Sequence, residues 1–262
     1  MKTELIGTVF LSEKRKSILL MLMDGPTTID EIKERLTGTS SAIMTQIKIL
    51  LEQGLIEHND HEYNLTYIGK IVVKKMQPLI ETLNVLEENK GFWQNRDLSP
   101  IPFELLDRIG ELGDVMIYEP DLNHLFEPPK ELLESLQRAS NVYTIYSYFC
   151  PSCPMNYSQL AKKGTNYNLI LTRPVYDRLK NEYKDEYNTM MQAPNSNLYI
   201  FDDTSVKLGA LSVTDDLMLI AFFNKDGVFD HKKVISFEKS ALQWGKDLFE
   251  YYRERSEKVT NP

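Results

Sequence analysis

Residues 28–65 read TIDEIKERLTGTSSAIMTQIKILLEQGLIEHNDHEYNL, and this stretch decides the fold of the first part of the chain. Thr28 and Glu31 have the spacing of a capping box, in which the threonine hydroxyl accepts from the glutamate amide and the carboxylate reaches back. The box predicts a helix that ends at Leu36. The polar residues 37–40 that follow are typical of a short turn.

A second helix and a hairpin complete this stretch. The apolar residues after the turn repeat at helical spacing, which predicts a helix from about Ser41 to Gln53, and Gly54 is a good helix terminator. Residues 55–58 and 62–65 have the composition of two short strands, so they predict a β-hairpin.

Helices are also expected on both sides of the quoted stretch. Residues 12–23 predict one helix, which Asp24-Gly25-Pro26 stops, and Thr66 caps another that runs to about Asn89. Three helices, a hairpin and a further helix form, in this order, the layout of an α+β winged helix-turn-helix. We therefore expect residues 1–75 to bind duplex DNA, with the third helix in the major groove.

The third helix supplies the expected DNA contacts. Its apolar residues are expected to face the core, and they are Ile43, Ile47, Leu50 and Leu51. Helical geometry then turns four residues outward, toward DNA: Ser41, Met44, Thr45 and Lys48. Ser40 and Ser41 also begin the helix, where backbone amides suit a phosphate. Lys14, Arg15 and Lys16 are expected to clamp a flanking phosphate. The alternative is an ordinary solvated face of a helical bundle.

The charge of the chain is unevenly distributed. The net charge is −8, yet residues 1–75 hold 10 Lys and Arg against 10 Asp and Glu, so all of the excess acid lies further along. The expected hairpin tip, residues 58–63, has no Lys or Arg and carries Asp60 and Glu62. A phosphate-binding tip is usually basic, so we expect His61 to make only a minor DNA contact. Such a head is expected to bind as a dimer on two half-sites.

The predicted helix after the hairpin carries a short coiled-coil seam. The apolar residues are spaced four and three apart, and they are Val72, Met76, Leu79, Leu83 and Leu86. We expect residues 76–113 to be a helical linker and dimerisation segment, and the protein to be a homodimer. Pro78 is expected to kink or break the helix. The alternative is that the seam packs on its own domain.

Strand and helix patterns alternate in residues 114–262, which predicts an α/β sensor domain with a mixed sheet. Six strands are expected, at residues 115–118, 142–149, 168–171, 198–201, 207–213 and 217–223. The last two are expected to form an antiparallel hairpin at the edge of the sheet. The acidic pairs 202–203 and 215–216 are interpreted as turns, and His231-Lys232-Lys233 as a solvated turn.

The two cysteines form a Cys150-Pro151-Ser152-Cys153 motif between a predicted strand and a predicted helix. Ligands and redox groups often bind at this position in α/β sheets. Three interpretations of the pair Cys150 and Cys153 remain open: a reversible disulfide, half of a metal site, and buried structural cysteines. Tyr146 and Tyr148 share one face of the preceding strand, and they are candidates either for an effector site or for the core.

Several segments resemble known regulators. Residues 40–57, SSAIMTQIKILLEQGLIE, and residues 63–69 resemble the recognition helix and wing of archaeal and bacterial winged-helix regulators. Five further segments resemble the sensor domain of the archaeal FilR1 regulators, which are common in methanogens: residues 198–203, 206–209, 223–230, 241–245 and 248–253. The resemblance covers nearly the whole chain. It implies a transcription regulator linked to methanogen metabolism.

The expected function is therefore DNA-binding transcription regulation, with double-stranded DNA and a small-molecule effector as partners. No common phosphate-loop, zinc-protease or esterase motif is present, so we expect no enzyme activity, cofactor or metal. No apolar run reaches about 18 residues, and residues 1–10 lack a signal-peptide core, so a cytoplasmic protein is expected. The alternatives are a protein-interaction module and an enzyme with a DNA-binding appendage.

Overall fold

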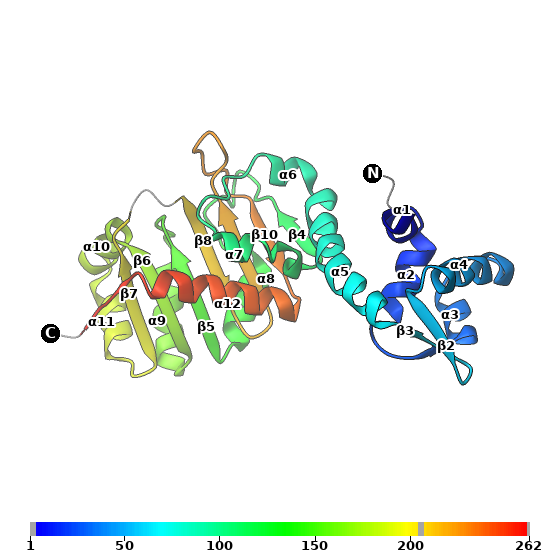
Figure 1. The fold of residues 1–262 in the computed structure, drawn as a ribbon. Coiled ribbons are helices and arrows are strands. Elements are labelled where there is room, and N and C mark those ends of the chain that lie inside the picture. The colour runs from blue at the N-terminus through cyan, green and yellow to red at the C-terminus, as the bar shows by residue number, and fades with distance from the viewer. Residues whose placement is uncertain (1–3, 204–206, 261–262) are drawn as a thin grey trace. The chain divides into compact units, whose positions relative to one another are not determined.

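The structure of the protein is a computed structural model that describes residues 4–203 and 207–260 (Figure 1). The chain divides into two compact units, residues 1–80 and residues 81–262, and the long helix α5 (Tyr67–Glu88) contains the boundary between them. Each unit has its own hydrophobic core.

The first unit consists of helices packed on a small sheet. Its elements are α1 (Glu4–Phe10), α2 (Glu13–Met21), β1 (Thr27–Thr28), α3 (Ile29–Arg35), α4 (Ser40–Glu52), β2 (Ile56–Asn59), β3 (Glu62–Leu65) and the first part of α5. The strands form an antiparallel sheet in the order β1-β3-β2. The predicted helices and the predicted hairpin are confirmed, whereas α1 and β1 were not predicted.

Local interactions explain where these helices begin. The capping box is confirmed, because Thr28 N donates to Glu31 Oε2 at 2.8 Å and Glu31 N donates to Thr28 Oγ1 at 3.4 Å. The hydroxyl of Thr39 caps α4 by accepting from Ala42 N at 3.3 Å. Each cap satisfies backbone amides that have no partner within the helix.

One apolar core holds the first unit together. The side chains that are at most 1% exposed come from every helix after α1, and include Ile18, Ile32, Ile43, Ile47 and Val73. Leu51 was expected among them, but it is 37% exposed. Its position lies on the rim of the apolar stripe of α4, where Ile47 and Leu50 already fill the inner side.

Helix α5 continues through Pro78, so the proline does not break it. Of the expected seam, Met76 is 2% exposed and belongs to the core of the first unit, whereas Leu79 and Leu83 are exposed by 47% and 43%. Part of the seam is therefore core, and part of it faces solvent.

The second unit is built on a sheet of eight strands. Its elements after α5 are α6 (Lys90–Gln94), α7 (Phe103–Leu106), the 3-10 helix η1 (Ile109–Leu112), β4 (Val115–Tyr118), α8 (Lys130–Arg138), β5 (Asn141–Tyr146), α9 (Cys153–Lys163), β6 (Asn166–Thr172), α10 (Arg173–Glu182), α11 (Lys184–Gln192), β7 (Ser196–Phe201), β8 (Leu208–Val213), β9 (Met218–Phe222), β10 (Lys233–Ser236), α12 (Lys239–Arg253) and β11 (Glu257–Lys258). The strand order is β11-β7-β6-β5-β8-β9-β10-β4.

The sheet is mixed, as the sequence predicted. β5, β6 and β7 are parallel, and the pairs on either side of them are antiparallel. All six predicted strands are present, and β10 and β11 were missed. The prediction that β8 and β9 lie at the edge is wrong, because β10 and β4 add to β9 and extend the sheet by two strands. The acidic turn between β8 and β9 closes this inner hairpin.

Helices cover both faces of the sheet (Figure 1). The β5-α9-β6 and β6-α10-α11-β7 connections step across the sheet in one direction, and crossovers of one hand place their helices on one face. α8 packs on that face as well. α12 crosses the other face, where Trp244 Nε1 donates to Leu105 O at 2.8 Å.

The segment expected as a linker, residues 76–113, is divided by the unit boundary after Ile80. From Glu81 onward it belongs to the second unit, where Trp93 and Leu112 are 5% and 1% exposed in the core under α12. The described helices include none with the length and apolar character needed to cross a bilayer.

Lys233 also departs from the sequence prediction. It was expected in a solvated turn, but it begins β10 and is only 3% exposed. The reason is tertiary: Lys233 pairs with Tyr118 of β4, a strand that is far away in the sequence.

The contact between α5 and the hairpin gives a stability prediction. A Cβ on Gly69 would lie 1.9 Å from the carbonyl oxygen of Leu55, so Gly69→Ala is expected to destabilise the first unit by about 3 kcal/mol. The control is Gly7→Ala in α1, where the new Cβ meets only Leu11 Cδ1 at 3.6 Å, and where alanine favours the helix. Urea unfolding with hydrogen exchange on first-unit amides measures both variants. Equal stabilities would contradict the close contact.

Candidate functional site

The first candidate site is the exposed face of α4. Ile43, Ile47 and Leu50 turn inward and are at most 1% exposed. The predicted contact residues lie together on the outer side of the helix, and all of them are exposed: Ser40, Ser41, Met44, Thr45 and Lys48. The helix therefore presents a continuous surface of hydroxyl, thioether and ammonium groups.

Two of these side chains have weak partners on their own helix. Thr45 Oγ1 donates to the carbonyl oxygen of Ser41 at 2.9 Å, so the hydroxyl can still accept a hydrogen bond. Lys48 Nζ lies 3.8 Å from Glu52 Oε1, and the two side chains are 76% and 60% exposed. Such a surface pair contributes little, so the ammonium can turn to a stronger anion.

Lys14 lies next to the turn that leads into α4. A Cβ on Gly38 would be 2.9 Å from Lys14 Cε and 3.4 Å from Lys14 Nζ. The amine of Lys14 is thus close to the N-terminal end of α4, where Ser40 and Ser41 begin the helix. A helix N-terminus attracts anions, and a nearby ammonium adds to that attraction.

Arg15 and Lys16 have partners inside the first unit. The guanidinium of Arg15 donates to Thr8 O at 2.5 Å, to Gly7 O at 3.2 Å and to Gln46 Oε1 at 2.6 Å. Arg15 therefore ties α1 and α4 to α2. Lys16 Nζ lies 2.8 Å from Glu13 Oε1. Sequence reasoning assigned the same role to Lys14, Arg15 and Lys16, but the structure gives them different surroundings.

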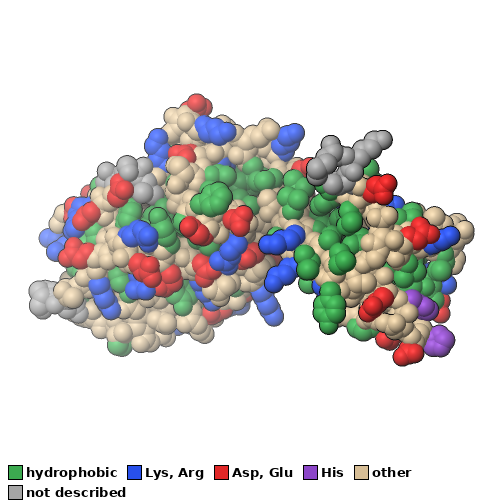
Figure 2. Space-filling view, in the orientation of Figure 1, with side chains coloured by type: hydrophobic (Ala, Val, Ile, Leu, Met, Phe, Trp, Pro, Cys, Tyr) green, Lys and Arg blue, Asp and Glu red, His purple; other side chains and the backbone are tan. Residues whose placement is uncertain are grey.

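The hairpin between β2 and β3 ends in a two-residue turn, Asp60 and His61, both with positive φ angles of 46° and 75°. His61 is exposed, and His58 stacks on Tyr63 with 4.5 Å between ring centroids. Figure 2 shows histidine and acidic side chains at this tip. The tip therefore repels phosphates more than it attracts them.

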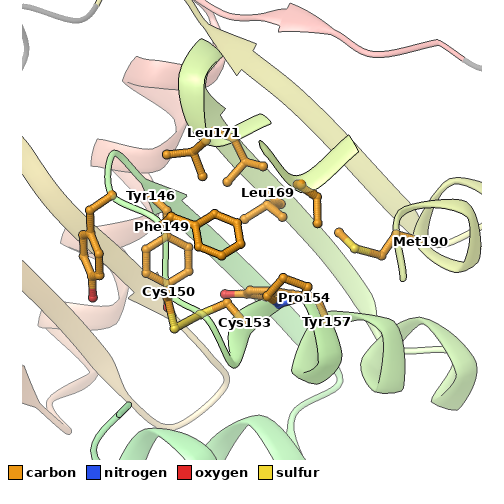
Figure 3. Close-up of a pocket in the computed structure, with 12 residues that line it drawn as sticks. Tyr146, Phe149, Cys150, Cys153, Pro154, Tyr157, Leu169, Leu171 and Met190 are labelled. Carbon is orange, nitrogen blue, oxygen red and sulfur yellow. A yellow bond between two sulfur atoms is a disulfide. The ribbon is translucent and has the colours of Figure 1, made fainter. Parts of the chain in front are cut away.

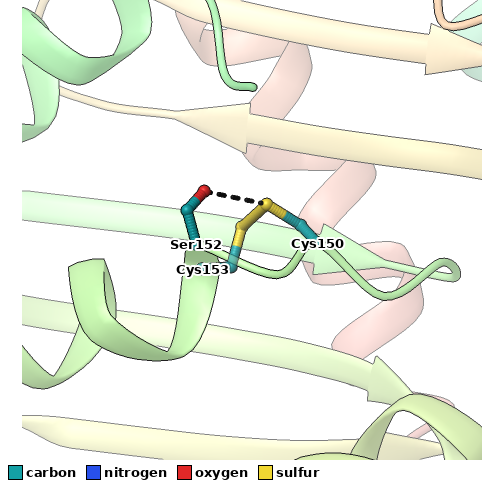
Figure 4. The surroundings of a disulfide bond; sticks show 3 residues. All are labelled: Cys150, Ser152 and Cys153. Atoms are coloured by element: carbon teal, nitrogen blue, oxygen red, sulfur yellow. Dashed lines mark hydrogen bonds between the residues drawn. A yellow bond between two sulfur atoms is a disulfide. The ribbon is translucent and has the colours of Figure 1, made fainter. Parts of the chain in front are cut away.

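The second candidate site lies where β5 leads into α9. Cys150 and Cys153 form a disulfide with 5.3 Å between their Cα atoms, and the two residues are 5% and 8% exposed. Ser152 Oγ lies 3.5 Å from Cys150 Sγ (Figure 4). Within the residues that the structure describes, no cluster of three His, Cys, Asp or Glu side chains has the arrangement of a metal site.

An apolar pocket lies behind the disulfide (Figure 3). Its lining comes from β5, α9, β6, α10 and α11, and consists of Tyr146, Tyr148, Phe149, Cys150, Cys153, Pro154, Tyr157, Leu169, Leu171, Val175, Leu179 and Met190. The cavity between these side chains is about 20 Å³, which is room for one water molecule. An effector therefore has to displace side chains in order to enter.

Three tyrosines, Tyr146, Tyr148 and Tyr157, are part of the lining of this pocket. Tyr146 and Tyr148 both line it, with 5.7 Å between their ring centroids. Burial raises the pKa of Tyr146, Tyr148 and Tyr157, so their hydroxyls stay protonated at neutral pH and are able to donate hydrogen bonds.

Sequence reasoning missed the part of the lining that comes from later elements. Leu171 reaches the pocket because it pairs in register with Tyr146, and Met190 reaches it from α11. Each of these residues is ordinary in its own segment, and no local pattern singles it out.

Two comparisons with known proteins agree on one family. Residues 125–255 match the middle domain of methanogenesis regulatory protein FilR1, and residues 3–84 match its N-terminal domain. The chain is 26% identical over 255 residues to the methanogenesis regulatory protein FilR1 of Methanothrix harundinacea (strain 6Ac). The match covers 95% of this chain and 56% of that relative, so this chain spans about half of the relative's length.

Solved structures are more distant. TrmBL2, an archaeal chromatin protein with a novel mode of DNA binding, has a TM-score of 0.44 at 15% identity, covering 95% of this chain and 94% of that one. Nuc from Salmonella typhimurium, a phospholipase D family member, has a TM-score of 0.37 at 13% identity, covering 56% of this chain and 99% of that one. We draw no function from either likeness.

The disulfide gives a prediction about stability. It closes a loop with a sequence separation of 3, for which chain entropy gives about 2 kcal/mol. Dithiothreitol is therefore expected to lower the stability of the second unit by about 2 kcal/mol in urea unfolding. The control is the double variant Cys150→Ser with Cys153→Ser. Its stability should equal that of the reduced wild type and should not change when dithiothreitol is added. Uptake of two alkyl groups by the denatured, unreduced protein would contradict the disulfide.

Proposed function

This chain belongs to the FilR1 family of methanogenesis regulatory proteins, and from that premise we propose that it is a DNA-binding transcription regulator and not an enzyme. In this proposal the first unit is a winged helix-turn-helix that reads duplex DNA through α4. The second unit is the sensor. The observation that carries the proposal is the exposed polar face of α4, with Lys14 beside its N-terminal end.

The dimensions and chemistry of α4 support this role. A helix of 13 residues is about 20 Å long, and the major groove is wide enough to admit it. Ser40, Ser41 and Lys14 lie where a phosphate binds a helix N-terminus. Thr45 and Lys48, one turn further along, are placed for base edges or the next phosphate.

DNA binding should depend on the charge and hydroxyl on this face. Lys48→Glu is expected to weaken binding at least about tenfold and to lower the slope of affinity against salt, because a charge near phosphate is reversed. Thr45→Ala should lose less. Fluorescence anisotropy on genomic DNA fragments that the protein itself selects measures both effects.

The matched control is Lys74→Glu, the same reversal at an exposed position of α5. It should retain the wild-type affinity. If Lys48→Glu, Thr45→Ala and Lys74→Glu all bind like the wild type, α4 is not the DNA-reading helix. The same titration with and without dithiothreitol tests whether the disulfide regulates binding, and identical curves would make Cys150 and Cys153 purely structural.

The first unit also offers a surface for a second copy of the chain. An apolar groove of about 400 Å³ lies between α1 and α5. It is lined by Leu5, Ile6, Val9, Phe10, Ile71, Val72, Lys75, Met76 and Leu79. Figure 2 shows hydrophobic side chains gathered over these helices. Apolar surface of this kind on a soluble protein marks an interaction site.

Self-complementarity favours a second copy as the occupant. The groove is bordered by its own protruding apolar residues, since Ile6 and Ile71 are 61% and 66% exposed. A two-fold axis lets the ridge of each copy fill the groove of the other. Two heads also compensate for the neutral charge of residues 1–75, because affinity is then shared between two half-sites.

The dimer is tested by placing charge in the groove. Ile6→Glu with Ile71→Glu is expected to give a monomer in light scattering at micromolar concentration, with weaker DNA binding. The control is Leu11→Glu, which changes an apolar residue that is 84% exposed and lies outside the groove. A wild-type protein that stays monomeric with and without DNA would contradict the dimer.

The second unit is proposed to sense an effector through the pocket behind the disulfide. The pocket has the apolar and aromatic walls that predominate in small-molecule sites. It also lies beyond the carboxyl end of β5, where the sheet changes from parallel to antiparallel pairing. Cys150 and Cys153 form one side of it.

A further inference from the structure

Lys233 is a buried cation without a matching anion. It is 3% exposed, and its ammonium donates to the carbonyl oxygen of His231 at 3.2 Å and lies 5.0 Å from the ring centroid of Tyr118. In the part of the chain that the structure describes, no carboxylate forms an ion pair with it. A buried ammonium with only a carbonyl and a ring for partners is costly to keep in a fold.

The charged neighbours of Lys233 are already paired with one another. Arg96 donates to both carboxylate oxygens of Asp230 at 2.8 and 2.6 Å. Lys232 Nζ lies 2.5 Å from Glu119 Oε1. These pairs do not include Lys233, and the carboxylates of Asp121, Glu127 and Glu131, which act on the neighbouring Tyr118 ring, form no ion pair with it.

His231 adds a second polar group without a partner. Its Nδ1 is buried and makes no hydrogen bond to any residue that the structure describes. The backbone of His231 has a positive φ of 60°, which few residues with side chains adopt. Its ring is surrounded by Phe229 at 4.7 Å, Phe126 at 5.3 Å and Tyr148 at 6.3 Å between centroids.

A row of residues across the sheet connects Lys233 with the apolar pocket. Tyr146 pairs with Ala210, and Ala210 pairs with Ala221. Val234 pairs with Ile220, and the same antiparallel register extended by one residue sets Lys233 opposite Ala221. Three strand spacings separate Tyr146 from Lys233, which is about 14 Å. The two alanines between them have small side chains and are buried.

Aromatic rings pack over this row of residues. Tyr148 lines the pocket and packs on Phe229 with 4.7 Å between centroids. Phe229 in turn covers Gly209, where a Cβ would lie 2.5 Å from the phenylalanine ring. Tyr148 is therefore a shared wall between the pocket and the group formed by His231 and Lys233.

We propose that His231 and Lys233 bind the anionic group of a small amphipathic ligand, a carboxylate or a phosphate monoester, whose apolar part enters the pocket past Tyr148. The inference deepens the proposed sensor role. Ligand binding is measured without DNA, so its failure is distinguishable from a failure of the DNA-binding proposal. The anion supplies a negative charge beside the ammonium of Lys233 and accepts a hydrogen bond from the ring N–H of a neutral His231.

The test uses the full chain and simple probes. Phenylacetate and phenyl phosphate, at matched ionic strength and pH 7.5, are each added to the protein in a thermal-unfolding assay and in calorimetry. At least one of them should raise the unfolding midpoint. The compound with the larger effect shows whether the site prefers a carboxylate or a phosphate. Benzyl alcohol has no charge and inorganic phosphate has no apolar part, so each should bind at least about tenfold more weakly.

Lys233→Met removes the charge and keeps the length of the side chain, so it should fold at least as well as the wild type and lose the response to the anion. The matched control is Lys232→Met, the neighbouring residue, whose partner Glu119 is at the surface. It should keep the response. Equal stabilisation of the wild type and Lys233→Met would overturn the proposal, as would the absence of any response in the wild type.

A second measurement needs no variant. Burial lowers the pKa of Lys233 to about 8, so the charge that attracts the anion is lost above that pH. Benzenesulfonate keeps its own charge, and its affinity should fall about sixteenfold in total between pH 8 and pH 9.5, in step with the charged fraction of Lys233. Burial keeps His231 neutral in this range by lowering its pKa, and raises the pKa of Tyr118 and Tyr148. Other charged side chains beside Lys233 are the pairs of Arg96 with Asp230 and of Lys232 with Glu119. An affinity independent of pH would exclude Lys233 as the anion's partner.

Discussion

The pairing of β5 is the constraint on which the second unit depends. β5 is parallel to β6 on one side and antiparallel to β8 on the other. The parallel side requires crossover helices, and these place α9 and the disulfide directly beyond the end of β5. The antiparallel side needs no helix between its strands, and it brings β9, β10 and β4 into one continuous face. The pocket and Lys233 share a face because this one strand belongs to both halves.

The electrostatics of the two units follow different rules. In the first unit the charged groups on α4 lie at the surface, where water screens them and leaves them available to a polyanion. Arg15 is the exception, because carbonyl oxygens and an amide take up its donors and turn it into a structural tie. In the second unit Lys233 is shielded from water, so its charge interacts strongly with an anion close to it. Charge at the surface suits a large polyanion such as DNA. Buried charge suits a small anion that can enter the interior of the unit.

The sequence predicted those features that are determined locally. Thr28 and Glu31 are only three positions apart, and together they determine the start of α3. The spacing of the apolar residues in α4 is enough to identify its outer face. The mixed sheet followed from the alternation of strands and helices. Lys233 was not predictable in this way, because its own segment is polar and its burial comes from pairing with Tyr118. The position of β8 and β9 inside the sheet depends on the same distant pairing.

The two features of the second unit, a disulfide and a buried cation, meet at Tyr148. This residue lies two positions before Cys150, lines the pocket, and has its ring 6.3 Å from that of His231. The disulfide fixes residues 150–153 at the start of α9, and so it limits how far the segment carrying Tyr148 can move. A ligand that needs Tyr148 to turn away therefore binds with a different free energy to the oxidised and the reduced protein. Linkage is reciprocal, so an anion that favours one redox state also shifts the reduction potential of the disulfide toward that state. In the proposed sensor, thiol chemistry and anion binding therefore both act through Tyr148.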